Sequence, residues 1–301
     1  MFAKLILPLV LALSLPAHAA APQEIELHFR PAPNVKQRLN IGMNMSTGID
    51  LMPGADAPPD TVAKIAERRQ QLGKGFTMDM QMQMRAEASE ADAKGDYLLH
   101  LRGEGGHIKL NMPDGQAKEM PVPQAGLEMD MLLNAQSHKT ELLRLKGMSV
   151  KMDEASQQVF VNQMMQQLGG QFAALEGRKL KIGESAEIPF DMQLPMGQLP
   201  QNMKLSATIK LTLRSVHQGV AVFDEDVQMQ FATDGNPNEP NQPRITAKGS
   251  GKGQLSYRLA ERIPVRNDLD LAMHMDTELP GKVDMKMEML MKMRMKGEQL
   301  R

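Results

Sequence analysis

Strict alternation of apolar and polar residues is the dominant pattern along this chain. Residues 205–214, LSATIKLTLR, alternate without a break, and residues 269–276, LDLAMHMD, alternate except at Ala272. Residues 285–296, MKMEMLMKMRMK, carry methionine at every second position. Because successive side chains of a strand point to opposite faces, these segments are expected to be long strands with one apolar face. As helices they would spread methionine all round the cylinder.

Shorter segments with strand-like composition fill most of the remaining chain, and turn residues such as Pro113-Asp-Gly115 separate them. Short connections between consecutive strands favour antiparallel pairing. The sequence therefore predicts a mainly β protein, with a large curved antiparallel sheet shaped as a half-barrel or a sandwich. The further strands are expected at residues 24–30, 36–51, 75–87, 96–102, 107–112, 127–133, 141–148, 184–194, 221–232 and 246–259.

Two helices interrupt this pattern. Pro59-Asp-Thr61 begins a short one, and a longer central one is expected over residues 154–175. The central segment carries apolar residues at spacings of three and four, which is one face of a helix. We expect it to pack as a lid on the concave face of the sheet and to divide the chain into halves, 24–150 and 176–301.

The first 19 residues have the features of a signal peptide. Lys4 precedes an apolar run over residues 5–15, and Ala17-His-Ala19 has the small residues that a signal peptidase recognises. The run is too short to span a bilayer. We expect cleavage after Ala19, a periplasmic or secreted location, a single β-rich domain over residues 20–301, and no integral membrane span.

Charge and cysteine content narrow the function classes. The chain has 35 Lys and Arg against 36 Asp and Glu, so no net positive charge favours nucleic acid as a partner. It has no cysteine, which excludes disulfides, thiolate metal sites and a cysteine nucleophile. No cofactor is expected, and the sequence does not indicate an oligomeric state.

Methionine is the unusual component, with 28 residues against eight phenylalanines, two tyrosines and no tryptophan. Methionines at every second position either form a core or line a soft apolar surface that binds a lipid or an apolar peptide. On the second interpretation, two groups of methionines face the longest ladder. The expected ligand face consists of Met285, Met287, Met289, Met291, Met293 and Met295, with Met78, Met80, Met82, Met84, Met273 and Met275 opposite.

Three other roles for the methionines stay open at this point. Thioethers bind Cu(I) without losing a proton, so Met-x-Met pairs on adjacent strands can form a copper site. A reversible sink for oxidants and a purely structural envelope protein are the other two. No other metal site is expected.

No residue pattern indicates a catalytic centre, so the chain is predicted not to be an enzyme. The histidines are scattered, and Asp224-Glu-Asp226 is expected at a solvated strand edge, with a weak divalent-ion site as the alternative. The glycines of residues 249–253 precede a strand and not a helix, so they do not form a phosphate loop. They are expected to mark a bulge or bend of the sheet.

The segment Leu180-Lys-Ile-Gly-Glu-Ser-Ala-Glu-Ile-Pro189, placed after the central helix and before the glycine-rich strand, resembles the exported bacterial proteins grouped as domain of unknown function 6263. Gly183-Glu-Ser185 matches the middle of the family's motif, and Ala186 stands where the family has an aromatic residue. The resemblance implies an envelope β protein and assigns no catalytic residue. The expected architecture is also similar to the half-barrels of periplasmic lipoprotein carriers, as an analogy of fold alone.

Overall fold

The computed structural model of the chain describes residues 24–28, 30–54, 57–73, 75–122, 126–136, 140–147, 176–195, 202–233, 244–279 and 283–300. The expected signal peptide and the expected helix at 154–175 lie outside these residues. The strands and the one helix of the described part are β1 (Glu24–Glu26), β2 (Lys36–Pro53), α1 (Pro59–Leu72), β3 (Phe76–Ala88), β4 (Tyr97–Asn111), β5 (Ala117–Pro121), β6 (Glu128–Leu133), β7 (Thr140–Lys146), β8 (Lys179–Lys181), β9 (Ser185–Pro195), β10 (Asn202–His217), β11 (Val220–Thr233), β12 (Arg244–Arg258), β13 (Ile263–Leu279) and β14 (Val283–Gln299).

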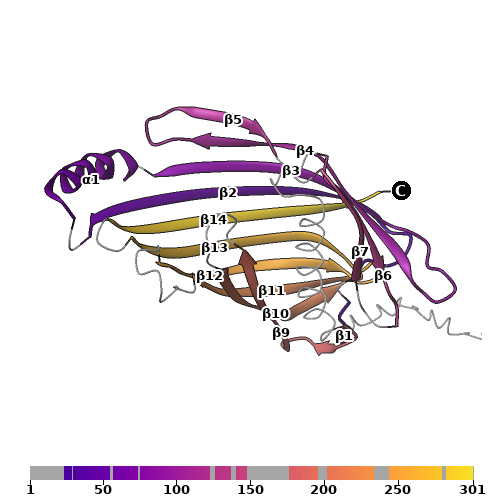
Figure 1. Cartoon of the computed structure of the whole chain (residues 1–301). Helices are drawn as coiled ribbons and strands as arrows, with labels where there is room; N and C mark the ends of the chain where they lie inside the picture. Colours follow the sequence, from indigo (N-terminus) through magenta and orange to yellow (C-terminus); the bar gives the residue numbers. More distant parts are fainter. Residues whose placement is uncertain are drawn as a thin grey trace, which may run out of the picture.

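Twelve strands form one antiparallel sheet, in the order β7-β6-β4-β3-β2-β14-β13-β12-β11-β10-β9, with β5 paired to β4 (Figure 1). Strands β7 and β9 lie at the two ends of this order, and in the described part of the chain the sheet is not closed into a barrel. The structure thus confirms the predicted mainly β class and the large antiparallel sheet. Strands β5 and β8 were not predicted.

The first and last long strands of the chain meet in the middle of the sheet. β2 pairs with β14 over their whole lengths, from Pro53 opposite Val283 to Gln37 opposite Gln299. Strands β2 to β7 therefore form one side of the sheet, the first wing, and β9 to β14 form the other, the second wing. Each wing is a meander of strands that follow one another along the chain.

One bulge keeps the apolar residues of β4 on a single face. The sequence predicted two strands here, but β4 is continuous, and its pairing with β3 shifts between Gln83 and Met84. Glu104 is the additional residue of β4 at this point. A single extra residue reverses the alternation. The bulge therefore brings Leu99 and Leu101 to the face that carries Ile108, although these residues differ in parity.

The buried core lies mainly at one end of the sheet. β1 pairs with β8 in a separate two-stranded sheet, and their apolar side chains pack on the second wing. Phe223 and Leu213, with Leu180 of β8, are at most 1% exposed. Two smaller clusters lie on the first wing, around Tyr97 and around Met131.

An N-terminal strap joins the two wings at the end of the sheet that holds the core. The strap consists of residues 27–28 and 30–35. Tyr97 of β4 donates a hydrogen bond from its hydroxyl to the carbonyl oxygen of Pro31 at 2.6 Å, and Tyr257 of β12 donates one to the carbonyl oxygen of His28. Backbone bonds add to this contact: Ala32 N–H donates to Glu261 O at 2.9 Å. Both tyrosines of the chain therefore hold the strap.

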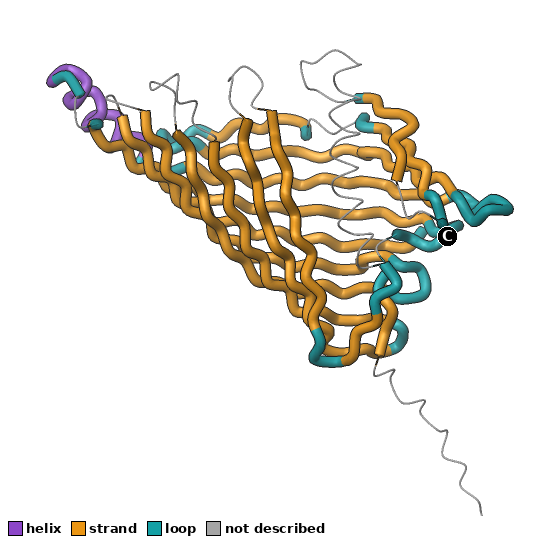
Figure 2. Tube along the Cα trace, turned by 60° about the horizontal axis from the view of Figure 1, so that its bottom comes forward, coloured by secondary structure: helices purple, strands orange, loops and turns teal. Residues whose placement is uncertain are grey.

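These contacts show which way the sheet curves. Five strand spacings separate β4 from β12, which corresponds to ~24 Å in a flat sheet. The three residues from His28 to Pro31 reach only ~10 Å when fully extended. The tips of Tyr97 and Tyr257 must therefore converge, and the face from which they project is concave. Figure 2 shows this curvature in the strands.

Helix α1 lies at the other end of β2 (Figure 1). It begins at Pro59, as predicted, and proline is well tolerated there because the first helical N–H has no intrahelical partner. Ile65 is its buried residue, and Arg69 pairs with Asp50 of β2 at 2.6 Å. No helix in the described ranges is both long and apolar enough to cross a membrane.

Candidate functional site

The concave side of the sheet, called the apolar face below, carries rows of apolar residues that run across the strands. In one row, Met293 of β14 lies directly opposite Met43 of β2, and Met43 lies opposite Met80 of β3. The next row has Met291, Met45 and Met78 in the same arrangement. Side chains directly opposite in an antiparallel pair have Cβ atoms ~5 Å apart, so each row is a continuous band of thioethers.

The strand register places all twelve methionines of the expected ligand face on the apolar face. Their arrangement differs from the expectation, because neither of the other two groups faces the longest ladder across a gap. The four methionines of β3, Met78 to Met84, lie on the same face of the sheet and are separated from β14 by β2. Met273 and Met275 are closer to the ladder. They lie beside Met289 and Met287 in the neighbouring strand. The twelve residues are Met78, Met80, Met82, Met84, Met273, Met275, Met285, Met287, Met289, Met291, Met293 and Met295, and all of them are partly exposed.

This partial exposure distinguishes the methionine rows from the core at the strap end. The alternating residues of β14, such as Lys292 and Arg294, are exposed on the opposite face, as the cost of burying an unpaired charge requires. Met131, at 4% exposed, is the one methionine among the buried core residues of the described part of the chain. The methionine rows are therefore a surface with partial access to solvent.

Strand β12 contributes three glycines, Gly249, Gly251 and Gly253, to the apolar face. The expected bulge is not at these residues, because their pairing with β11 and β13 continues without a shift. Neighbouring side chains lean over the glycines instead. A Cβ atom at Gly249 would lie 2.9 Å from Cγ of Met229, and one at Gly251 would lie 3.0 Å from Cδ1 of Leu271.

Two polar side chains lie among these apolar ones, on the two strands that flank β12. Glu225 of β11 is 9% exposed, which contradicts the expected solvated position for this part of the acidic cluster. Burial raises the pKa of its carboxyl, and a hydrogen bond from Asn267 of β13 opposes the rise. The signal was present in the sequence, because Phe223 and Val227 share the parity of Glu225. Its two acidic neighbours, Asp224 and Asp226, have the opposite parity and obscure this pattern.

The strap end of the apolar face holds a group of polar side chains around Arg30. Burial lowers the pKa of Arg30, and nearby Tyr97 and Glu176 oppose this effect. Burial also raises the pKa of both tyrosine hydroxyls. Arg30 donates a hydrogen bond from Nη1 to the carbonyl oxygen of Asn134 at 2.7 Å. These polar side chains lie where the strap crosses the apolar face, and the alternating pattern of the sequence does not indicate them.

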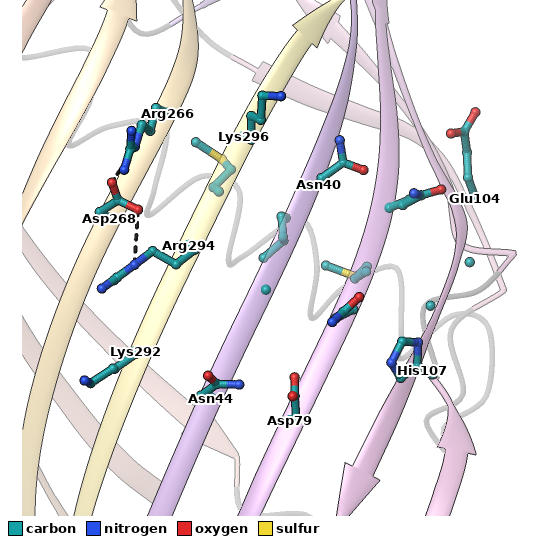
Figure 3. A pocket seen from close by; sticks show the side chains of 18 of the residues that line it. Asn40, Asn44, Asp79, Glu104, His107, Arg266, Asp268, Lys292, Arg294 and Lys296 are labelled. Carbon is teal, nitrogen blue, oxygen red and sulfur yellow. Dashed lines mark hydrogen bonds and ion pairs between the residues drawn. The ribbon is translucent and has the colours of Figure 1, made fainter.

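The opposite, polar face of the sheet carries a hollow of about 1140 Å³ (Figure 3). It extends across β13, β14, β2, β3 and β4, and its lining is mixed in charge. The labelled side chains are Asn40, Asn44, Asp79, Glu104, His107, Arg266, Asp268, Lys292, Arg294 and Lys296.

Ion pairs account for many of the charges around this hollow. Arg294 lies 3.2 Å from Asp268 and 3.1 Å from Asp270. Arg38 donates a hydrogen bond to Glu104 at 2.8 Å, and this bond holds the pKa of the Glu104 carboxyl below its usual value. Among the residues that the structure describes, no three His, Asp or Glu side chains gather in a way that could hold a metal ion. The hollow therefore has the character of a surface with mutually neutralised charges.

Comparisons with known proteins give no family for the chain. No family model matches it, and no curated protein matches it either. The crystal structure of OccK5 (OpdH) from Pseudomonas aeruginosa covers 89% of this chain and 100% of its own, at 7% identity and a TM-score of 0.24. That of OccK7 (OpdD) from the same organism covers 88% and 99%, at 7% identity and a TM-score of 0.21. At such TM-scores these structures carry no information on the fold or function of this chain.

Proposed function

We propose that the chain is a non-catalytic exported protein, periplasmic or secreted, that binds an apolar ligand or partner on its apolar face. The observation that carries this proposal is the combination of rows of partly exposed methionines with a concave sheet. Sites for apolar molecules are typically concave, largely apolar and equipped with a few polar groups. Methionine suits such a surface, because its flexible thioether adapts to ligands of different shape.

Native mass spectrometry of protein purified from its own envelope, with organic extraction of whatever is bound, tests the proposal directly. A bound lipid or apolar peptide is the expected result. Consistently ligand-free protein that also takes up no apolar probe would contradict the proposal.

Adjacent residues of β14 offer a matched pair of variants. Met291 lies on the apolar face, whereas Leu290 is 58% exposed on the polar face. Met291→Gln is expected to weaken binding of the apolar fluorophore N-phenylnaphthylamine about tenfold, or ~1.4 kcal/mol, because a polar amide replaces a thioether. Leu290→Gln is expected to leave the dye affinity unchanged. Equal effects of the two variants would place the binding elsewhere.

Binding of Cu(I) is a second candidate, because Met43, Met80 and Met293 lie side by side on three adjacent strands. Soft thioether ligands favour Cu(I) over harder cations. The test is competition with a chromogenic Cu(I) chelator under reducing conditions, on the whole protein and on Met43→Leu. Tight binding that Met43→Leu weakens would support a copper site, and failure to compete with the chelator would dismiss it.

A further inference from the structure

The apolar face contains a polar site formed by Glu225 and Asn267. One carboxylate oxygen of Glu225, Oε2, and the amide oxygen Oδ1 of Asn267 are both shielded from solvent and have no hydrogen-bond partner. Gly253 lies directly between their strands, opposite Glu225 on β12. Oε2 would be 3.2 Å from a Cβ atom at this glycine. The missing side chain therefore lets the carboxyl extend across β12 towards β13.

When Glu225 is ionised, the two unpartnered atoms are both acceptors. Asn267 already supplies a hydrogen bond to the carboxyl, so its remaining unpartnered atom is an oxygen. Within the described ranges no lysine or arginine side chain forms an ion pair with Glu225. Thr47 and Gln37 of β2 also carry unpartnered buried oxygens, but ten positions apart on one strand. Leaving a buried polar group unpaired is costly, so a binding partner that donates hydrogen bonds gains from this site.

We infer that the apolar face takes an amphipathic amine, with its apolar chain on the methionine rows and its ammonium group hydrogen-bonded by Glu225 and Asn267. This inference rests on the proposed function and names the chemical class of its ligand. An ammonium group provides three donors and a positive charge, so it satisfies both free oxygens and neutralises the carboxylate. A neutral hydroxyl donates one bond, and a carboxylate or phosphate head is repelled.

Access to the site lies through a flexible neighbour. Met295 of β14 is directly opposite Asn267. Its thioether has several rotamers of similar energy, so it can move aside without strain in the backbone. The apolar chain of the ligand then lies along Leu269 and Met293, which continue the row of Glu225 and Gly253 across the sheet.

Three ligands with the same alkyl chain separate the head group from the chain: dodecylamine, dodecanol and dodecanoate. Isothermal titration of the whole protein, below the micelle concentration of each, is expected to give the affinity order amine, alcohol, carboxylate. Glu225→Gln is expected to reduce the preference for amine over alcohol about tenfold or more, since the negative charge of the acceptor is lost, and to change the alcohol affinity much less. Asn267→Leu is expected to reduce the same preference independently.

Glu288→Gln is the matched control, because Glu288 is exposed on the polar face of β14, between two methionines of the apolar face. This variant is expected to keep the preference for the amine. Equal binding of amine and carboxylate by the unchanged protein, or an amine preference that survives both Glu225→Gln and Asn267→Leu, would overturn the inference. Failure of all three ligands to bind would instead contradict the proposed function itself.

Discussion

Burial of the Glu225 carboxyl makes the stability of the fold depend on pH. Its pKa is raised in the folded state, so the folded protein keeps the proton at pH values where the unfolded chain has lost it. Between the ordinary pKa of a glutamate and the raised one, the free energy of unfolding therefore falls as the pH rises. Below that pH window, Glu225 makes a constant contribution to the free energy of unfolding. Above the window, the full cost of keeping an ionised carboxyl buried has been subtracted.

Glu225→Gln is expected to remove this dependence. The variant should gain stability relative to the unchanged protein as the pH rises through the window. Urea unfolding at a series of pH values, followed by circular dichroism, measures the difference. Glu288→Gln, at an exposed position, should give a curve parallel to that of the unchanged protein, and a parallel curve for Glu225→Gln would show that this carboxyl does not titrate abnormally.

The glycines of β12 give a second prediction for single residues. A Cβ atom at Gly253 would lie 2.5 Å from the carbonyl oxygen of Asp268, so Gly253→Ala requires the backbone to shift. We expect a loss of ~1–3 kcal/mol in the free energy of unfolding, the usual cost of overpacking. Gly48 of β2 has nothing within 4 Å of the same position, and Gly48→Ala should be neutral or stabilising. Equal denaturation midpoints for the two variants would contradict this account.

At the scale of single elements, the sequence located the long strands because alternation is a local signal. Strands β9 to β12 and β14 begin and end within three residues of the predicted bounds, and helix α1 begins at the predicted Pro59. Strand β13 begins six residues before the predicted segment. The short strands β5 and β8 were missed because five or three residues do not establish a period, and they exist only through their partners β4 and β1. The bulge at Glu104 explains why the sequence predicts two strands where β4 is continuous. The bulge reverses which residues of the alternating pattern are apolar, and such a reversal resembles the end of one strand and the start of another.

The strap between β1 and β2 depends on the two tyrosine hydroxyls. Tyr97→Phe and Tyr257→Phe each remove one hydrogen bond to a backbone carbonyl of the strap, and each is expected to cost ~1 kcal/mol of unfolding free energy. Limited proteolysis should then cut the strap more readily than in the unchanged protein. Unaltered stability and unaltered cleavage in both variants would mean that the strap is held by its backbone bonds alone.

The same hydroxyls are expected to resist alkaline titration. Burial raises their pKa in the folded state, so the phenolate absorbance of the folded protein should rise at higher pH than that of the urea-unfolded chain. The sign for stability follows from linkage: the unfolded chain loses these protons first, and the free energy of unfolding falls as the pH rises above the ordinary pKa of tyrosine. Because the chain has two tyrosines and no tryptophan, the phenolate absorbance reports only on the two tyrosines that hold the strap.

At the scale of the whole molecule, the sequence predicted the class of the fold, a curved sheet and the common face of the methionines, but not the polar site. Alternation assigns each residue to a face, but it does not specify which strands are neighbours. The register of β11, β12 and β13 brings Glu225, Gly253 and Asn267 together, and this is long-range information. The position of the core also differs from the interpretation that the methionines form it. The most deeply buried residues lie under β1 and β8 and not along the methionine rows.

The middle of the sheet depends on β14. Removal of residues 283–301 exposes the edges of β2 and β13, which pair with β14 along almost all of their lengths. We expect this loss to exceed the whole stability of a typical domain, ~5–15 kcal/mol, so that the truncated chain does not fold. Circular dichroism and gel filtration measure the result.

A synthetic peptide with the sequence of residues 283–301 is expected to restore β structure to the truncated chain, and a peptide of the same composition in scrambled order is not. A truncated chain that remains a folded monomer would show that the two wings are stable without their common strand.

The pairing of β2 with β14 also has a consequence for the synthesis of the chain. A ribosome releases β2 before the other strands of the sheet and β14 after them, so every nascent chain passes through a stage at which both wings are nearly complete and the seam between them is missing. Strand edges left open in this way pair readily with other chains. The risk of aggregation is therefore greatest before β14 leaves the ribosome, and a chaperone that keeps the two wings apart until β14 arrives is expected to raise the yield of folded protein.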